Sequence, residues 1–316
     1  MIKNFAKPLI VSFFLIICLS LAVNAELPSQ EIDKTVISDL KSKDVSVRRM
    51  AVEKLGNINN NDSLKYLTKA LTDDEFVVRM SAVNSLAKLK NKEAINALGE
   101  VLLNDKESQV RHNAILALQR IGDKAAAPFV LKALEDKYDG VRYQAPIALG
   151  LIKADNAVDV LNGLVDNEDK NMSKQVIIGL SFFRDEKSAP FVEKALTDEN
   201  VKVKEAACNT LQKLNSRSSI PKIKPLLMDE NEIVKLAAAE ALAGMEDRSG
   251  LDACLSLLKS NNDSVKERAL RLLGLVGDQS HVPLIKKYES DEKLESSAKI
   301  ALDRLSGRFP KEQKKK

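Results

Sequence analysis

One repeat of about 31 residues runs through this sequence and constrains its fold more than any other feature. A Val, or a Met or Leu in its place, recurs with steps of 31, 32, 31, 31, 31, 31, 31 and 29 residues. These anchor positions are Val47, Val78, Val110, Val141, Met172, Val203, Val234, Val265 and Leu294. A period this regular predicts an array of small structural units in which each unit contacts only its neighbours.

Each copy of the repeat predicts a pair of helices. The residue four after the anchor is almost always Ala, and the residue eight after it is always Leu. Residues at this spacing share one face of a helix, which we call helix B, and a small central residue lets two helices approach closely. An amphipathic segment precedes it as helix A, and Pro128, Pro190 and Pro221 fall where that helix would start. Each copy is therefore predicted to fold as helix, turn, helix, turn.

An Asp lies six residues before the basic residue that follows the anchor in five copies. The pairs are Asp73 and Arg79, Asp105 and Arg111, Asp136 and Arg142, Asp198 and Lys204, and Asp229 and Lys235. The Asp falls in the turn, where it can accept hydrogen bonds, and the basic group can reach the Asp of a neighbouring repeat. The pattern fails at Asn167/Ser173, Ser260/Lys266 and Glu289/Glu295. We expect a ladder of ion pairs to break at these three places.

The full pattern of one copy, L-x-D-x-x-x-x-V-R-x-x-A-x-x-A-L-G, runs from Leu134 to Gly150. It resembles the HEAT repeat family, and more closely the HEAT-like branch first described in phycobilisome lyases, over roughly residues 31–307. The resemblance implies that the Asp and basic residues form a structural ladder along the array. The predicted fold is all-α, a right-handed α-solenoid (superhelix) of about nine antiparallel helix pairs of ~31 residues. The expected repeats are approximately 31–60, 61–91, 92–123, 124–155, 156–186, 187–216, 217–247, 248–278 and 279–307.

The first 25 residues differ in character from the repeats and predict a cleavable signal peptide. Lys3 and Lys7 precede an apolar run over residues 9–22, and small residues close the segment at Ala25. The run is shorter than the ~20 residues that a membrane span needs. An uncleaved anchor and a lipoprotein modified at Cys18 are the alternatives. We expect a periplasmic or secreted protein.

The last residues, 308–316, form a basic tail that contains Lys311, Lys314, Lys315 and Lys316. Such a tail is usually solvated. Contact with an anionic membrane surface or a cell-wall polymer is the alternative.

Charge and cysteine usage argue against nucleic-acid binding and against a disulfide. Removing residues 1–25 takes away two lysines and leaves 47 basic against 45 acidic residues, a balance that gives no reason to expect nucleic acid. Cys208 and Cys254 occupy predicted core positions two repeats apart, too far for a disulfide. We expect both to be buried thiols.

Histidine usage argues against catalysis and against a metal site. His112 and His281 each lack a second His at ligand spacing. The HEAT-like family includes deoxyhypusine hydroxylases with His-Glu iron ligands, but Asn113 and Val282 follow the two histidines here. We expect no enzyme, no metal and no cofactor. A cofactor-handling or enzyme-associated protein similar to the HEAT-like bilin lyases is the alternative.

One surface of helix B is the candidate binding site. Side chains two, six and ten residues after the anchor should point away from the buried stripe, towards the concave surface. This set is mostly polar in the outer repeats and largely apolar in the middle. The candidates are Met80, His112, Leu116, Tyr143, Ile147, Leu151, Ile178 and Phe182. We expect a protein or an extended peptide to bind this strip as to a scaffold or adaptor, unless local packing buries it.

Overall fold

The structure, a computed structural model, describes residues 31–58 and 60–307. The predicted signal peptide, residues 1–25, and the basic tail, residues 308–316, lie outside this part of the chain. Within it there are eighteen α-helices, eight short 3-10 helices and no strand. The all-α prediction is confirmed. No helix in the described ranges is long and apolar enough to cross a membrane.

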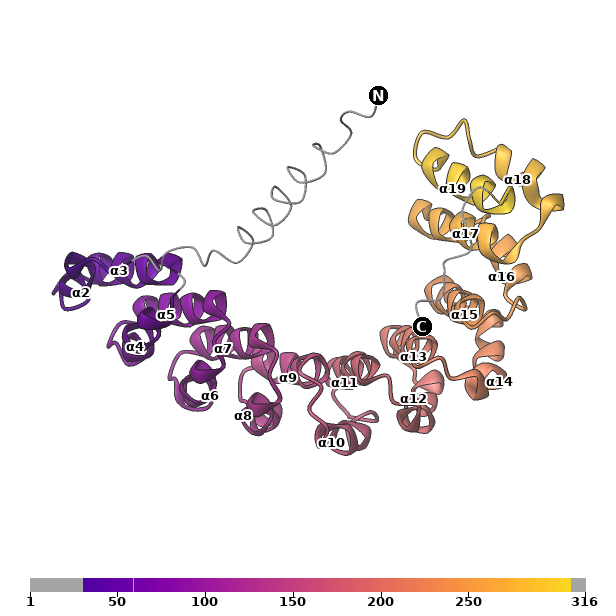
Figure 1. Cartoon of the computed structure of the whole chain (residues 1–316). Helices are drawn as coiled ribbons and strands as arrows, with labels where there is room; N and C mark the ends of the chain where they lie inside the picture. Colours follow the sequence, from indigo (N-terminus) through magenta and orange to yellow (C-terminus); the bar gives the residue numbers. More distant parts are fainter. Residues whose placement is uncertain (1–30, 59, 308–316) are drawn as a thin grey trace, which may run out of the picture. The chain divides into compact units, whose positions relative to one another are not determined.

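The chain separates into two compact units at Ala94/Ile95, and we describe each by itself. The described part of unit 1 contains α2 (Lys34–Asp39), α3 (Val45–Ile58), α4 (Asn61–Ala70), α5 (Phe76–Leu89) and η1 (Lys92–Ala94). In this unit α3 and α5 pack against each other as the two helices B, with α2 and α4 as helices A (Figure 1).

Unit 2 continues the alternation of helices A and B. Its helices A are α6 (Ile95–Asn104), α8 (Ala127–Lys132), α10 (Ala157–Gly163), α12 (Ala189–Lys194), α14 (Ile220–Ile223), α16 (Leu251–Leu257) and α18 (Val282–Lys286). Its helices B are α7 (Ser108–Ile121), α9 (Asp139–Leu151), α11 (Lys170–Phe183), α13 (Val201–Leu214), α15 (Glu232–Gly244), α17 (Asp263–Val276) and α19 (Glu295–Leu305). Short 3-10 helices flank several helices A: η2 (Lys124–Ala126), η3 (Ala133–Glu135), η4 (Glu186–Ser188), η5 (Ala195–Thr197), η6 (Arg217–Ser219), η7 (Lys224–Met228) and η8 (Gln279–His281).

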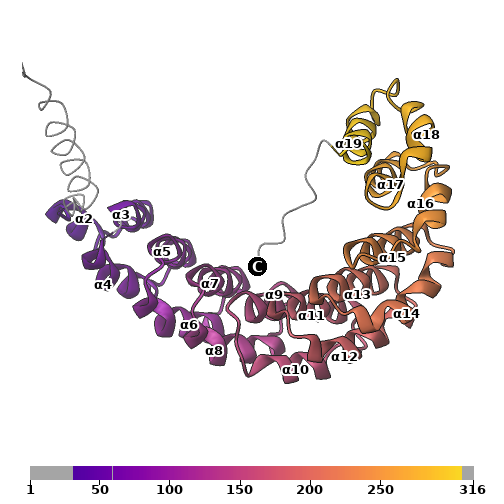
Figure 2. The ribbon, with the colours of Figure 1, turned by 45° about the vertical axis from the view of Figure 1, so that its right-hand side comes forward.

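Successive helices B of unit 2 pack side by side, and the helices A cover their outer side (Figures 1 and 2). The Ala four residues after each anchor, and Val176 in the fifth repeat, are at most 1% exposed in both units. The Leu eight residues after the anchor is fully buried as well, except for the half-buried Leu302 of the last repeat. Within each unit the core is therefore a stripe along the helices B, as the periodicity predicts.

The last repeat ends the stack with a polar surface. In the preceding repeats the residue five after the anchor is buried, for example Ile177, Cys208 and Leu270. In α19 the same position is Lys299, which is exposed and forms an ion pair with Glu295. Helix α19 thus carries an exposed charge where the other repeats bury an apolar residue.

Helices α9 and α11 approach each other more closely than side chains would allow. A Cβ added to Gly179 would lie 2.4 Å from the carbonyl oxygen of Pro146, and one added to Gly150 would lie 2.3 Å from the carbonyl oxygen of Gly179. Pro146 stands inside α9 and is buried in this contact. The irregular fifth repeat is thus a site of backbone-to-backbone packing.

Two buried polar atoms in unit 2, Asn162 Oδ1 and Ser188 Oγ, have no hydrogen-bond partner among the described residues. One repeat later, the residues at the same positions are Glu193 and Ser219, and the Ser219 hydroxyl donates to Glu193 at 2.6 Å. Glu193 also binds Lys222 at 2.5 Å. Because Asn is one methylene shorter than Glu, the same bond is not formed between Asn162 and Ser188.

The glycine contact predicts opposite effects for two Gly→Ala changes. Gly179→Ala should lower the free energy of unfolding by about 2 kcal/mol or more, because the added Cβ meets rigid backbone. Gly163→Ala, where nothing lies within 4 Å of the added atom, should raise it by about 0.5 kcal/mol. Urea denaturation of the two variants measures both. Equal effects at the two sites would contradict the close contact.

The missing hydrogen-bond partner of Ser188 predicts that two Ser→Ala changes differ in their effect on stability. Ser188→Ala should leave the free energy of unfolding unchanged or raise it, because the hydroxyl makes no bond that is lost. Ser219→Ala should lower it by about 1 kcal/mol through loss of the bond to Glu193. The same denaturation measurement compares them, and a larger loss at Ser188 than at Ser219 would refute the assignment.

Candidate functional site

The inner layer of unit 2 holds seven of the eight candidate binding residues. Leu116 on α7 is 38% exposed and Leu151 on α9 is 39% exposed. The other five, all half-buried, are His112, Tyr143, Ile147, Ile178 and Phe182. They come from three helices, α7, α9 and α11, that pack against one another. We call these seven residues the inner strip.

Position in the repeat alone does not decide exposure on this layer. Leu236 of α15 stands two residues after its anchor, as Tyr143 does, and is fully buried. Tyr143 is therefore partly exposed where the corresponding residue of the seventh repeat is packed. The eighth candidate, Met80, lies half-buried on α5 of unit 1.

Polar contacts fix the orientation of the strip's aromatic residues. The Tyr143 hydroxyl donates to the Asp169 carboxylate at 2.6 Å, and the Arg142 guanidinium lies 5.4 Å from the centre of the Tyr143 ring. The hydrogen bond to Asp169 raises the pKa of Tyr143 above its ordinary value. The Lys213 ammonium lies 5.7 Å from the centre of the Phe182 ring.

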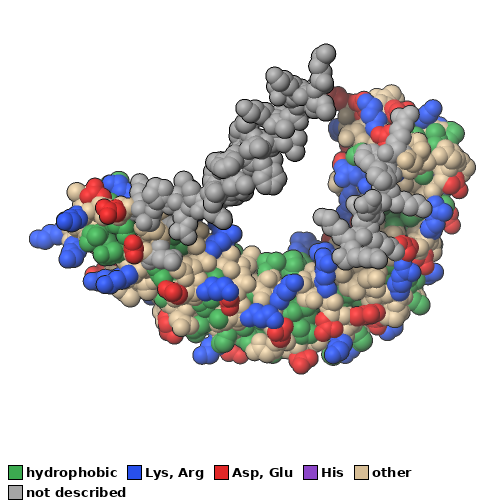
Figure 3. Space-filling model, in the orientation of Figure 1, with side chains coloured by type: hydrophobic (Ala, Val, Ile, Leu, Met, Phe, Trp, Pro, Cys, Tyr) green, Lys and Arg blue, Asp and Glu red, His purple; other side chains and the backbone are tan. Residues whose placement is uncertain are grey.

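His112 is held in the same way, with its Nδ1 3.1 Å from the carbonyl oxygen of Gly140 in the next repeat. The inner strip is thus an ordered surface of apolar groups with cations beside it. In the space-filling view, hydrophobic side chains are interspersed with Lys and Arg side chains along unit 2 (Figure 3).

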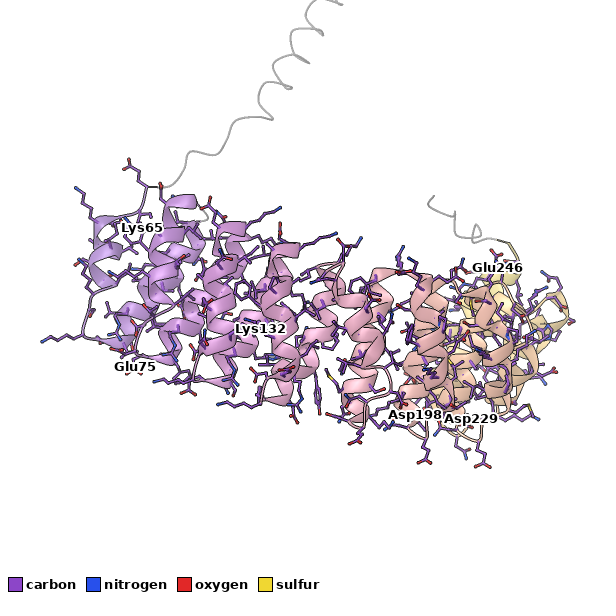
Figure 4. All side chains as sticks on the ribbon, turned by 90° about the horizontal axis from the view of Figure 1, so that it is seen from below. Lys65, Glu75, Lys132, Asp198, Asp229 and Glu246 are labelled. Atoms are coloured by element: carbon purple, nitrogen blue, oxygen red, sulfur yellow. The ribbon has the colours of Figure 1, made fainter. Side chains whose placement is uncertain are left out.

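The predicted ion pairs run along the turns between helices A and B, at the N-terminal ends of the helices B. Arg111 binds Asp136 of the next repeat through two nitrogens, both at 2.8 Å, and Lys204 binds Asp229 at 2.5 Å. Lys170 binds Asp198 at 2.8 Å. Asp198 and Asp229 lie along one edge of unit 2 (Figure 4). The cation of one repeat therefore pairs with the Asp of the following repeat.

Within one repeat, the arginines also bind the backbone of their own turn. A guanidinium nitrogen of Arg111 donates to the Asp105 carbonyl at 3.0 Å, and Arg142 does the same to the Asp136 carbonyl at 2.8 Å. In unit 1, Arg79 donates to the Asp73 carbonyl at 2.9 Å. The six-residue spacing found in the sequence corresponds to this backbone contact, and a flat guanidinium has enough donors to make both contacts.

Each ladder Asp also caps its turn. Asp105 and Asp136 accept hydrogen bonds from the backbone N–H two residues further on, at 2.9 and 2.8 Å. Burial raises the pKa of Asp136, but the hydrogen bonds from Arg111 and from the Tyr138 N–H outweigh it, so this pKa lies below its ordinary value. The pKa of Asp229 is lowered by the same balance, with hydrogen bonds from Lys204 and the Asn231 N–H and a smaller effect of nearby Lys235.

The regular ladder is altered where the sequence pattern fails. Asn167 accepts the turn hydrogen bond at 2.9 Å, but it cannot form an ion pair with a cation. Arg142 binds Asp139 of its own helix at 2.6 Å instead, and it keeps only a longer contact, 4.0 Å, with Asp169 of the next repeat. At the eighth repeat, the Ser260 hydroxyl donates to Glu232 at 2.6 Å. In the last repeat Glu289 and Glu295 stand at these two positions.

Sequence reasoning missed two pairs of the ladder. Arg48 binds Asp73 in unit 1 at 2.8 and 2.9 Å, although Ser42 stands where its own repeat would have Asp. The Lys170–Asp198 pair was missed as well, since the cation precedes its anchor. A search for a cation 25 residues before an Asp would have found Arg48–Asp73, Arg111–Asp136 and Lys204–Asp229.

The remaining side chains with chemical potential are the metal-ligating residue types, the two cysteines and His281. The described residues contain no group of three or more His, Cys, Asp or Glu placed to hold a metal ion. Burial raises the pKa of Cys208 and of Cys254 to about 12, so both stay protonated thiols. His281 caps the turn of η8 through Asp278, with 2.9 Å between Nδ1 and the carboxylate oxygen.

A family model described as HEAT repeats matches residues 32–119, 95–172, 127–203, 160–243 and 190–267. These overlapping stretches cover the chain from residue 32 to residue 267. A comparison with curated proteins found no match.

Solved structures show the same type of fold. Karyopherin Kap95p, from a structure with RanGDP, aligns with a TM-score of 0.65 at 14% identity over 88% of this chain and 45% of its own. Kap121p, bound to the extreme C-terminus of the protein phosphatase Cdc14p, aligns with a TM-score of 0.59 at 15% identity over 86% of this chain and 41% of its own. This chain spans less than half the length of either karyopherin. The CpcE–CpcF phycocyanin lyase of Nostoc sp. PCC7120 aligns at 0.43, with 21% identity over 80% of this chain and 96% of its own.

The ladder predicts a pH-dependent loss of stability. Arg111→Met leaves the Asp136 carboxylate buried without its partner and should lower the free energy of unfolding at pH 7 by about 3 kcal/mol. The native pKa of Asp136 is depressed, so the pair stabilises the fold above the unfolded-state pKa of ~3.9 and is lost as the pH falls through the native value. The difference between wild type and variant, measured by urea denaturation, should shrink below pH ~4.

The matched control is Arg217→Met, which removes an ion pair with Glu246 whose side chains are more than half exposed, 56% and 58%. We expect a loss of less than about 0.5 kcal/mol for it. A deficit of Arg111→Met that stays constant from pH 7 to pH 2 would contradict the role of Asp136.

Proposed function

This chain belongs to the HEAT repeat family, and we propose that it is a non-catalytic scaffold or adaptor that binds a protein or an extended peptide along the inner face of its helices B. The inner strip carries this proposal. It places apolar side chains of three adjacent helices on one surface, with Leu116 and Leu151 more than a third exposed. Contiguous exposed apolar surface of this kind marks binding sites in soluble proteins.

The aromatic side chains of the inner strip are held in fixed orientations, which supports a binding role over accidental exposure. Tyr143 is held by Asp169 and Arg142, and Phe182 is covered on one side by Lys213. A side chain that is already held in one orientation loses less conformational entropy when a partner binds. Tyr is also one of the residues that contribute most to binding energy in protein interfaces.

The solved relatives add support at the level of the fold. Kap121p, whose fold this chain shares, is described with the C-terminus of another protein bound to it. A stack of helix pairs can thus hold a segment of a partner chain. We extend that mode of binding to this chain.

Export is part of the same proposal. The signal-peptide pattern of residues 1–25 supports a periplasmic or secreted scaffold of the cell envelope. The cofactor-handling alternative makes a different prediction, because it requires a bound chromophore or metal in the purified protein. An absorption spectrum and a metal analysis separate the two.

A cross-linking capture experiment on the exported fraction tests the proposal. Tyr143→Glu combined with Ile147→Glu should reduce capture of the wild-type partner at least about tenfold, because two charges would enter the apolar contact. The control is Val160→Glu combined with Phe191→Glu, which changes two exposed apolar residues of the outer helices α10 and α12, 44% and 38% exposed. This control should capture the partner as wild type does.

Both double variants must first show wild-type helical circular dichroism. Equal capture by the wild type and the folded inner-strip variant would reject the inner strip as the binding surface. Loss of capture by the outer control alone would move the site to the opposite face.

A further inference from the structure

A row of side chains ten residues after the anchors follows the C-terminal ends of the helices B in unit 2. Its members come from six helices: Arg120, Leu151, Phe182, Lys213, Leu275 and Arg304. We call them the edge row. The place between Lys213 and Leu275 is taken by Gly244, on α15. Neighbouring members stand on helices that pack against each other, so the row is continuous across unit 2.

The edge row lies away from the ion-pair ladder. The ladder residues stand where the helices B begin, and the edge row stands where they end. Figure 4 shows Asp198 and Asp229 on one edge of unit 2 and Glu246, which follows the end of α15, on the opposite edge. The ladder carboxylates therefore do not neutralise the cations of the edge row.

All charged members of the edge row are cations. Lys213 and Arg120 are exposed, and Arg304 is half-buried with a bond to the carbonyl oxygen of Arg271 at 3.2 Å. Two acids of the inner face are paired, since Glu240 binds Arg268 at 2.5 Å and Glu267 binds Arg271. On the edge itself, Glu246 binds Arg217 at 2.5 Å.

Helix stability alone explains only part of this row. Cations in the last turn of a helix interact favourably with its dipole, which accounts for Arg120, Lys213 and Arg304. It does not account for the apolar members between them. Leu275 is 56% exposed and Leu151 is 39% exposed. Exposed leucines between cations indicate a surface that a partner covers.

A hollow of about 480 Å³ lies within the same row, at Gly244. Gln212 and Arg271 line it together with Leu275. A Cβ on Gly244 would come within 2.0 Å of the Gln212 amide nitrogen, because the Gln212 side chain already lies against this glycine. The free space of the row at this repeat is therefore the hollow beside the Gln212 side chain and Leu275.

We propose that the edge row binds an extended acidic–apolar segment of a partner protein, one that crosses the helices B and places its carboxylates against Lys213, Arg120 and Arg304. The inference rests on the proposed scaffold function and specifies its partner. Packed helices lie about 8–10 Å apart, and an extended chain advances about 3.3 Å per residue. One contact therefore falls on about every third residue of the segment.

This spacing defines a pattern in the partner. Two apolar residues about three positions apart meet Leu151 and Phe182, and an acidic residue follows about three positions later opposite Lys213. A second acidic residue precedes the apolar pair, opposite Arg120. The segment runs along the row in one of the two directions, so the same pattern is expected forwards or reversed.

A random peptide display library selected on the purified full-length chain tests the inference. The enriched peptides should carry the apolar pair with Asp or Glu on both sides at about three-residue spacing. Their affinity for the wild type should fall as salt is raised, because exposed charges are screened. Enrichment of basic peptides, or no enrichment at all, would overturn the inference.

Charge reversal supplies the decisive variant. Lys213→Glu should weaken the selected peptides about tenfold, and a peptide with its acidic residue changed to Lys should regain affinity for that variant. The control is Lys202→Glu, an exposed lysine at the other end of the same helix, α13, which should bind as wild type does. A purely structural role for Lys213 would not produce rescue by the peptide.

The outcomes separate this inference from the proposed function. Apolar peptides that bind wild type, fail on the Tyr143→Glu, Ile147→Glu variant and ignore the charge at residue 213 would leave the scaffold function standing and reject the acidic partner. If the selected peptides bind the inner-strip variant with wild-type affinity, Tyr143 and Ile147 are rejected as part of the binding surface.

Discussion

Burial of the Val–Ala–Leu stripe between successive helices B is the interaction on which the rest of this structure depends. The central Ala is essentially without solvent exposure in both units, which brings neighbouring helices into close contact. Each helix B is packed on its flanks by its neighbours and on its outer side by the helices A. One face of the helix therefore remains uncovered. The side chains two, six and ten residues after the anchor stand on that face. Stacking of the helix pairs thus forms the inner surface, but the contacts of the stack do not cover it.

The two ends of each helix B have different electrostatic roles. At the beginning of the helix, cations are held by the Asp of the next repeat, as in Arg111–Asp136, and by their own turn. Those groups already have partners and stabilise the stack. At the end of the helix, Lys213 and Arg120 are exposed, and apolar side chains stand between them. The same residue types therefore stabilise the stack at one edge and are exposed at the other.

The fourth and fifth repeats supply five of the seven residues of the inner strip. Gly150 and Gly179 let the backbones of α9 and α11 touch, and this close approach brings Tyr143, Ile147 and Ile178 into one patch. Larger residues at the two glycines would hold these helices further apart. The close contact of the two backbones therefore shapes the surface of the inner strip as well as the core.

The sequence by itself determined the all-α solenoid, the alternation of helices A and B, and the buried anchors, because a period near 31 with i, i+4 and i+8 apolar residues admits no other helical face. It also located seven of the inner-face residues that the structure brings together on α7, α9 and α11. The tertiary structure decided which cation meets which Asp: the sequence spacing of six marks a backbone contact, while the ion pairs join residues 25 apart, as in Lys204–Asp229. It decided as well that Leu236 is buried where Tyr143 is half-exposed, and that Ser188 lacks the partner that Ser219 has. These outcomes depend on the distance between helices of different repeats, and that distance follows from side-chain volumes on both helices at once.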